Sequence, residues 1–410
     1  MSAVMAETRP ARQQTCQNIE NQGEGKPCKL ETGWRRIVRN FTPSWFAVNM
    51  GTGIVSILLH EFPYNAHWLQ YISEAIFGLN VLLFVVFLGL SATRYILYPE
   101  IWGVMIAHPG QSLFLGCVPM ALATIINMMV LSCRHWGDWL VYTAWGFWWL
   151  DVWLSIATCI SMPFIVMHRH RPNLENITAA LLLPIVPSVV ASASGGILAE
   201  VIPNNGHAVT TLITSYILWG IGEFFTACVL ALYFHRLMIH STPPKEVVVS
   251  VFLPIGPLGQ GGFGIQQLGK VAAMILPDTN STAFNVINDG GARAGEALYI
   301  LGVFLAIMMW GFGLVWMSLA VTTIFTMKKF PFNMGWWGFT FPLGVLATCT
   351  GSLAKNLNSD FFKIFNAVLS LLVVLLWVLV GVRTVKLALT GEMFHAPCLQ
   401  NIKKREERKH

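Results

Sequence analysis

The sequence predicts an all-α membrane protein in which ten transmembrane helices form five helical hairpins. The first reason is composition: 55% of the 410 residues are hydrophobic, 11% are charged, and the mean hydropathy is +0.59. Charged residues make up about a quarter of an ordinary soluble domain, so that class is excluded. The second reason is that ten apolar runs are long enough to cross a hydrocarbon core of about 30 Å. The third is a proline pattern that recurs in alternate runs.

The predicted spans follow one another with short connections. They lie near residues 43–62, 72–96, 111–133, 140–167, 177–202, 208–234, 247–276, 296–327, 333–354 and 361–382. Ten crossings place both chain ends on one side of the membrane. That side holds 21 Lys and Arg and the other side holds four, which is the distribution expected when both ends are cytoplasmic. We therefore predict a polar cytoplasmic tail over 1–40, a ten-helix membrane domain over 41–390 and a basic cytoplasmic tail over 391–410.

The remaining composition predicts a protein without cofactors. The formal net charge of +6 follows from the loop asymmetry and needs no nucleic-acid partner. The eight cysteines lack metal-ligand spacing and the histidines are scattered. We therefore expect no metal and no catalytic residues; the rival class is a membrane enzyme that uses interfacial histidines. Of three glycosylation sequons, the topology places only Asn280 on the outer side. No removable signal peptide is expected, because the first apolar run begins after residue 40.

Alternate spans share a proline pattern. Two of them carry the same spacing, in Pro184-Ile185-Val186-Pro187 and Pro254-Ile255-Gly256-Pro257. Prolines recur at similar depth in the third, fifth, seventh and ninth spans: Pro119, Pro184, Pro187, Pro254, Pro257 and Pro342. The first span has Gly51 and Gly53 at the comparable depth. A proline inside a helix removes a backbone hydrogen bond that lipid cannot replace, so such bends survive where they face protein or a wet cavity. The pattern predicts five bent inner helices around a central pore and five straighter outer helices.

Polar side chains on the odd-numbered spans fit the lining of a wet pore. The candidates are Asn49, Asn127, Ser188, Ser192, Gln260 and Thr348. Ser, Thr and Asn also hydrogen-bond between helices in membranes, and the sequence leaves that alternative open for each of them.

Charged residues in the spans are further candidates. Lys270 and Lys355 each lie thirteen residues beyond a proline, near the predicted outer mouth. They would form a vestibule that attracts anions, although snorkelling to the interface is the alternative and Glu200 at the corresponding place argues against a purely cationic ring. Asp151 and Glu223 lie deep in the fourth and sixth spans, where an ionised carboxylate is costly. They could couple proton movement to transport or have a structural role.

Four segments are typical of one family. They are Phe41-Thr42-Pro43-Ser44-Trp45-Phe46, Asn49-Met50-Gly51-Thr52-Gly53, Gly259-Gln260-Gly261-Gly262-Phe263-Gly264 and Trp336-Trp337-Gly338-Phe339-Thr340-Phe341-Pro342-Leu343-Gly344. Together with the ten spans, they resemble the tellurite-resistance/dicarboxylate transporter family, which includes the plant slow anion channels, over about residues 35–390. Within that family the first three segments look most like those of the fungal sulfite efflux pumps.

The resemblance implies a fold, a plug and a substrate. It implies five inner helices around a pore, five outer helices, and a homotrimer with one pore in each subunit. It also implies a phenylalanine plug on the ninth span, and the Thr340-Phe341-Pro342 motif assigns that role to Phe341. Phe339 shares a helical face with Pro342, so periodicity does not separate the two rings, and plain packing is the alternative for either.

The activity implied by the resemblance is export of sulfite or hydrogen sulfite across the fungal plasma membrane. One alternative is a proton-coupled permease for C4 dicarboxylates such as malate. That activity calls for a cation to hold the second carboxylate, and no Arg lies in the predicted bent spans. The other alternative is a channel for another small anion, such as nitrate or chloride.

Overall fold

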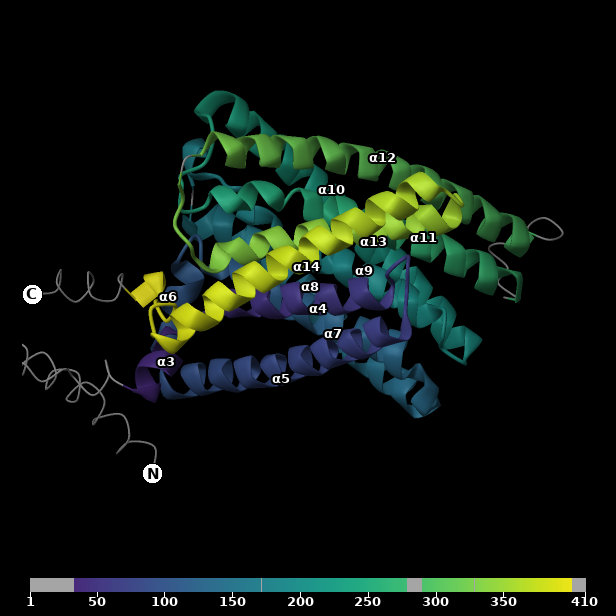
Figure 1. Cartoon of the computed structure of the whole chain (residues 1–410), viewed down its shortest axis with the longest axis horizontal. Coiled ribbons are helices and arrows are strands. Elements are labelled where there is room, and N and C mark those ends of the chain that lie inside the picture. Colours follow the sequence, from purple (N-terminus) through teal and green to yellow (C-terminus); the bar gives the residue numbers. More distant parts are fainter. Residues whose placement is uncertain (1–32, 171, 279–289, 328, 400–410) are drawn as a thin grey trace, which may run out of the picture.

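The computed structural model describes residues 33–399 apart from 171, 279–289 and 328. Every regular element in this part of the chain is a helix, with no strand. The long helices run roughly along one axis, and the described chain begins and ends at the same end of the bundle (Figure 1). We call this the tail end and the opposite one the far end. Most of the two predicted tails and the Asn280 sequon lie outside the described residues.

Among the described residues, five long helices are largely exposed along their sides. They are α5 (His67–Leu97), α8 (Asp138–Ile165), α10 (Asn205–His240), α12 (Gly290–Thr326) and α14 (Asp360–Leu389). Only 11–33% of the residues in their most apolar windows are buried. Apolar surface on this scale is expected of helices that face lipid.

Five shorter helices of the described chain are almost entirely buried. They are α4 (Phe46–His60), α7 (Cys117–Cys133), α9 (Val186–Ala199), α11 (Ile255–Ile275) and α13 (Thr340–Asn356). All 14 residues of α9 are buried, as are all residues of α4 except His60. These helices are largely apolar because protein covers most of the surface of each.

Short elements occupy the two ends of the bundle. At the tail end lie α3 (Trp34–Asn40), η1 (Pro43–Trp45), α6 (Glu100–Ala107), η2 (Ser112–Gly116), η4 (Val166–His170), η5 (Leu174–Asn176), η6 (Ala179–Leu182), η7 (Val248–Phe252), η9 (Met334–Phe339) and η10 (Pro397–Leu399). At the far end lie η3 (Arg134–Trp136) and η8 (Leu276–Asp278).

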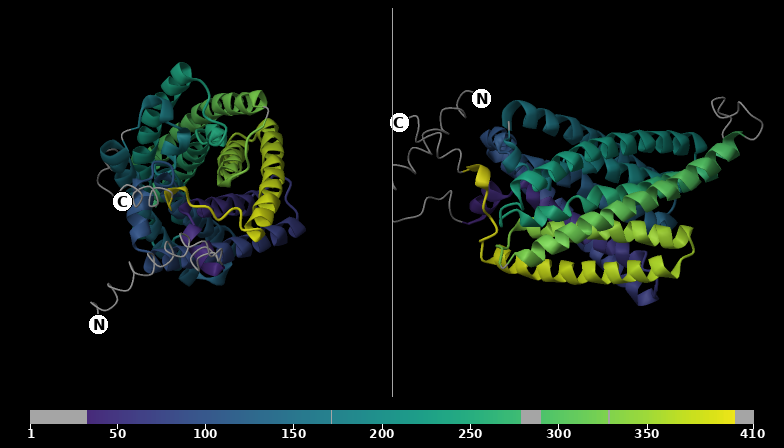
Figure 2. Two further views of the ribbon diagram at one scale, coloured as in Figure 1. Left: turned by 90° about the vertical axis from the view of Figure 1, so that its left-hand side faces the viewer. Right: turned by 90° about the horizontal axis from the view of Figure 1, so that it is seen from above.

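Packing contacts close the five buried helices of the described chain into a ring. Its order is α4, α7, α9, α11, α13 and back to α4. Each ring helix also packs against the long helix that follows it in the sequence, namely α5, α8, α10, α12 and α14. Viewed along the axis, α12 in green and α14 in yellow lie at the periphery (Figure 2, left).

The prolines lie at the starts of the ring helices, which corrects the prediction of bends in helix interiors. Pro254 is the N-cap of α11, and Pro119 and Pro342 are the third residues of α7 and α13. The first N–H groups of a helix have no intrahelical partner, so proline costs little there. The chain reaches each ring helix through a short 3₁₀ turn. At the first of these approaches, the axis of α3 makes an angle of 87° with the segment Pro43–His60.

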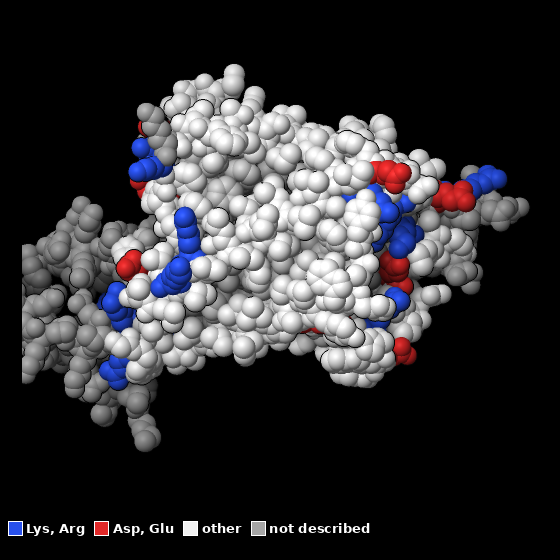
Figure 3. All heavy atoms as spheres, in the orientation of Figure 1, with Lys and Arg blue, Asp and Glu red and all other residues white. Residues whose placement is uncertain are grey.

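Length and composition identify a membrane protein. Within the described part of the chain, seven helical segments are long and apolar enough to cross a membrane, or eight if the bent pair Trp34–Asn40 and Pro43–His60 is one span. Charged side chains gather toward the two ends of the visible face, and the surface between them is almost uncharged (Figure 3). The protein therefore crosses the membrane several times, while the full set of ten crossings stays a prediction.

Candidate anion pathway

A cavity of about 780 Å³ lies at the tail end of the ring, and we call it the cup. All five ring helices line it with residues close to their first turns. These residues are Met50 of α4, Met120 of α7, Val186 of α9, Gly256 of α11 and Phe341 of α13. Helices that start at one level around a common axis leave a depression over their ends, and the cup occupies it.

The helix starts give the cup a favourable potential for anions. The N-terminus of a helix carries unpaired N–H groups and about half a positive charge. Five such ends surround the cup, and no Lys or Arg is found among the described residues that line it. Its titratable lining residues are Cys117, His170, Glu246, Glu392 and His395. The helix starts therefore favour an anion without a fixed cation that would trap it, while the carboxylates of Glu246 and Glu392 in the same lining act against them.

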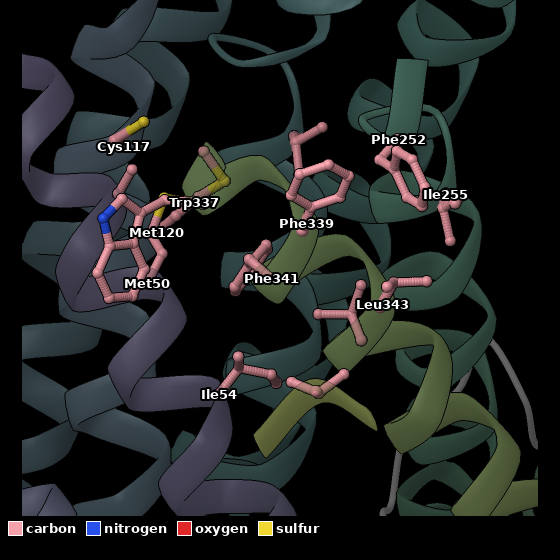
Figure 4. Packing of buried hydrophobic residues seen from close by; sticks show 14 of the residues in the cluster. Met50, Ile54, Cys117, Met120, Phe252, Ile255, Trp337, Phe339, Phe341 and Leu343 are labelled. Atoms are coloured by element: carbon pink, nitrogen blue, oxygen red, sulfur yellow. The ribbon is translucent and has the colours of Figure 1, made fainter. Parts of the chain in front are cut away.

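The two phenylalanines predicted as plug candidates lie in different places. Phe341 lines the cup and is only 4% exposed, and its ring points toward Met50 and Ile54 of α4 (Figure 4). Phe339 lies in η9, where its ring centroid is 4.9 Å from that of Phe252. Phe339 therefore packs against η7, whereas Phe341 lies at the floor of the cup.

Three predicted lining residues continue the cup-lining face of their helices toward the far end. The pairs are Met120 and Asn127 on α7, Gly256 and Gln260 on α11, and Phe341 and Thr348 on α13. Residues four or seven positions apart share a helical face. Asn127 also has a buried side-chain oxygen without a partner among the described residues.

Asn49 is turned toward an outer helix. Its Nδ2 donates to the backbone and side-chain oxygens of Asn80 on α5, at 3.0 Å each. Asn80 in turn donates to Thr124 on α7 at 3.2 Å. This chain of hydrogen bonds links three helices, so Asn49 takes the interhelical alternative rather than the lining role.

Ser188 and Ser192 also face outward from the ring. They share one face of α9 with Gly195, at spacings of four and three residues. A Cβ on Gly195 would overlap Ser215 of α10, and Ser188 lies against Gly222 of the same helix. This face packs against the outer helices, so the structure turns both serines away from the ring interior.

The two vestibule lysines are paired with acids at the far end. Lys270 of α11 lies 2.7 Å from Glu200, which follows α9, and Gln267 donates to the same carboxylate at 2.6 Å. Lys355 of α13 forms an ion pair with Glu61, which follows α4. Each pair joins neighbouring ring helices. The predicted cationic vestibule is corrected to a nearly neutral one, in which the lysines act as ties.

The two deep acids are buried, and three of their four carboxyl oxygens have no hydrogen-bond partner among the described residues. Both side-chain oxygens of Asp151 on α8 lack a partner, as does Oε1 of Glu223 on α10. Glu223 lies directly against Gly261 of α11, where a Cβ would overlap its carboxyl group. Glu223 therefore touches the outer side of the ring, while Asp151 belongs to the outer helix layer. In the described chain no cluster of three or more His, Cys, Asp or Glu suits a metal ion.

Sequence reasoning missed several residues of the pathway. Met120 lines the cup but gives no signal beyond its place in an apolar run, and Met50 lines it from within a family segment that was given no lining role. Glu61 lies at the end of the first span and pairs with Lys355. Its charge could have indicated this pairing, but only Lys and Arg were counted. Residues 391–399, assigned to a tail, also reach the cup.

Comparison with known proteins decides the family. The sequence profile of the SLAC1 family, described as voltage-dependent anion channels, matches residues 40–385. The chain belongs to the SLAC1 family. This agrees with the resemblance predicted from the sequence motifs.

Several proteins with sequence similarity to this SLAC1-family chain are named as transporters. The sulfite efflux pump SSU1 of Arthroderma otae is 46% identical over 379 residues, which are 92% of this chain and 98% of that protein. SSU1 of Trichophyton rubrum is 46% identical over 378 residues, with the same shares. The malic acid transport protein of Schizosaccharomyces pombe is 24% identical over 362 residues, 87% of this chain and 80% of that protein.

Proposed function

We propose that this protein is a sulfite efflux transporter of the fungal plasma membrane. Sulfite or hydrogen sulfite enters the cup at the tail end, passes Phe341 and leaves along the axis of the ring. The observation that carries this proposal is the cup itself, because all five ring helices direct their N-termini toward it and an aromatic ring forms its floor. The names of the relatives at 46% identity supply the substrate.

The proposed topology has ten crossings, with the tail end in the cytoplasm. The asymmetry of Lys and Arg supports this orientation. Residues 41–390 then form the membrane domain between two cytoplasmic tails, and Asn280 is the outward sequon. The exposed apolar sides of the outer helices contact lipid and, as the family resemblance implies, further copies in a trimer.

The pathway needs no energy coupling to export an anion. With the cell interior negative, each outward-moving negative charge gains about 2.3 kcal/mol per 100 mV. A selective conduit with a movable plug therefore suffices for net efflux. The lining residues proposed for it are Asn127, Gln260 and Thr348, which follow the cup-lining faces. No catalytic residue or cofactor is part of this activity.

The second candidate function is proton-coupled transport of a C4 dicarboxylate such as malate. Asp151 and Glu223 favour it, because a buried carboxyl group without a partner can carry a proton. The described lining of the cup offers no Lys or Arg to hold a second carboxylate, which favours hydrogen sulfite or another small monovalent anion.

Flux from proteoliposomes at clamped potential separates the candidates. Purified protein is reconstituted, the vesicles are loaded with sulfite, malate or nitrate, and a potassium gradient with an ionophore sets the voltage. We expect sulfite efflux that rises as the loaded side becomes more negative, with malate much slower. Flux that ignores the voltage and follows only the proton gradient would favour coupled transport. Active protein that passes nitrate but no sulfite would overturn the substrate.

A further inference from the structure

The segment after α14 crosses the tail face of the bundle. Residues 391–399, which we call the strap, leave α14 in a sharp turn at Gly391, whose φ is +80°. The strap then runs as the yellow segment in front of the helices when the bundle is viewed from its tail end (Figure 2, left). Four strap residues line the cup: Glu392, Met393, His395 and Pro397. The strap therefore forms part of the wall at the proposed cytoplasmic entrance.

The first half of the strap is held by contacts with the rim of the cup. The Phe394 ring stacks on Trp45 of η1, with ring centroids 5.0 Å apart and planes 18° apart. The backbone N–H of Ala396 donates to Oδ1 of Asn40 at 3.2 Å. Trp45 is one turn before the cup-lining part of α4, so the strap is fastened directly beside the helix that faces Phe341.

The end of the strap is held by a buried cation. Cys398 is fully buried, and its Sγ accepts from Nη2 of Arg94 at 3.7 Å. Arg94 is itself fully buried, and it also donates to the backbone oxygen of Arg39 and the hydroxyl of Tyr95. The acceptors around this buried guanidinium are two neutral oxygens and a thiol. Each hydrogen bond to them offsets part of the cost of removing the charge from water. Docking of Cys398 therefore satisfies a donor that would otherwise be left without a partner.

We propose that the strap is a lid on the cytoplasmic side of the cup, latched by the Phe394–Trp45 stack and the Cys398–Arg94 contact. Release of the strap widens the entrance and raises anion flux, and docking of the strap lowers that flux. The strap is fastened by hydrogen bonds to Arg36, Asn40 and Arg94, by the Phe394–Trp45 stack and by packing of Ala396 and Cys398 against Met105. These contacts lie outside the ring, so the lid can open while the ring stays packed. The inference rests on the proposed function only in taking the cup as the anion entrance.

Labelling of Cys398 tests the position of the strap without using transport. The full-length protein in liposomes is treated with a membrane-impermeant maleimide, and mass spectrometry follows modification of the peptide that contains Cys398. We expect slow labelling in the native protein compared with the denatured chain. Phe394→Ala should raise the labelling rate of Cys398 about 2- to 10-fold, because the stabilisation from one aromatic pair corresponds to a change of that size in the open fraction. Asn40→Ser, which shortens the acceptor for Ala396, should act in the same direction.

The matched control is Phe361→Ala, which removes a phenylalanine stacked on Phe365 at the far end of α14. It should leave Cys398 labelling at the native rate. Flux of sulfite and of nitrate from the tail side is then measured for the same variants. We expect both fluxes to rise in the order of the labelling rates.

The outcomes separate the lid from the substrate. If Cys398 in the native protein reacts as fast as in the denatured chain, the strap is not docked and the lid is overturned. If Phe394→Ala and Asn40→Ser speed labelling but leave both fluxes unchanged, the strap moves without controlling the cup, and the proposal also fails. If nitrate flux follows the labelling while sulfite flux is absent, the lid stands and the substrate proposal fails.

Discussion

At the scale of single residues, we propose that the Phe341 ring is the barrier at the floor of the cup. It is nearly fully buried and faces α4, so truncation opens the path from the cup into the ring. We predict that Phe341→Ala raises anion flux roughly tenfold, the change that removal of about 1.4 kcal/mol from a barrier gives. Stopped-flow measurement of sulfite release from proteoliposomes checks this.

Phe339→Ala is the matched control for that substitution. Phe339 packs on Phe252 and Trp336 outside the cup, so its truncation should lower thermal stability and leave the flux per folded protein near the native value. Equal increases in flux for both variants would remove the distinction between the two rings. An unchanged rate for Phe341→Ala would exclude it as the plug.

A second residue-scale prediction concerns pH at the tail end. His108 lies in the turn before η2, where its Nδ1 accepts the backbone N–H groups of Gly110 and Gln111 at 3.2 Å each. Burial is the main reason that the pKa of His108 is lowered from 6.5, and nearby His170 adds to it. The folded state thus holds His108 neutral. The contribution of His108 to the stability of the folded state is fully present above pH 6.5, and it is lost as the pH falls below that value toward the lowered pKa.

Thermal unfolding at pH 7.5 and pH 5 measures this linkage. The native protein should lose more of its Tm on acidification than His108→Gln, because glutamine keeps an acceptor oxygen and takes up no proton. His135→Gln, at the exposed far end, serves as the control and should lose Tm as the native protein does. The same loss in His108→Gln as in the native protein would show that His108 does not cause the acid sensitivity.

The limits of sequence reasoning at this scale follow from helical phase. The family motif assigned the plug to Phe341, and Phe341 lines the cup, while the plug role stays a prediction. Asn49 and Asn127 look alike in the sequence, since both are amides in apolar runs. Only the positions of α5 and α7 around the ring show that Asn49 bonds to Asn80 while Asn127 continues the cup-lining face.

At the scale of elements, close packing of the ring depends on glycine. A Cβ on Gly53 of α4 would overlap Thr124 of α7 and lie 2.8 Å from Asn80 of α5. We predict that Gly53→Val destabilises the protein by about 1–3 kcal/mol, the usual cost of overpacking. Gly78→Val on the exposed side of α5, where a Cβ meets nothing within 4 Å, should be nearly neutral. Tm values of the two variants in detergent test the comparison.

The far-end ion pairs support a second prediction about elements. Glu61→Gln and Glu200→Gln each leave a lysine without its acid at the far mouth. Partly exposed ion pairs contribute about 0.2–1 kcal/mol, so the fold should persist. The freed cation should raise the apparent affinity for sulfite added on the far side about 2- to 5-fold, in proportion to that energy. Lys355→Gln is the reference that removes the cation instead, and an identical affinity in all three variants would exclude an electrostatic role.

The proline pattern shows what the sequence predicts about elements and what it does not. Pro187 and Pro257 correctly predicted interruptions at equal depth in different spans, because proline lacks the donor that a helix interior needs. The interruption proved to be the start of an α-helix after a 3₁₀ turn rather than a bend. Sequence spacing alone does not distinguish a bend inside a helix from the start of a helix, since proline removes the same backbone hydrogen bond in either case.

At the scale of the whole molecule, composition predicted a multi-pass helical membrane protein and the sequence motifs indicated its family, and both are confirmed. The number of crossings stays a prediction, because α9 is shorter than a bilayer-spanning helix normally is. The pairing of Lys270 and Lys355 with acids depended on residues from distant spans that meet only in the closed ring. Local sequence patterns hold no information about such contacts.

The last prediction follows from the difference between the two ends of the ring. Five helix N-termini surround the cup, whereas the far mouth carries lysines already neutralised by Glu61 and Glu200. Anions should therefore bind more tightly from the tail end. In proteoliposomes with one known orientation, the sulfite concentration for half-maximal flux should be lower on the tail side. Raising ionic strength from 0.01 M to 1 M shortens the screening length from about 30 Å to about 3 Å and should reduce that difference. Equal half-maximal concentrations on both sides at low salt would show that the helix ends do not concentrate the anion.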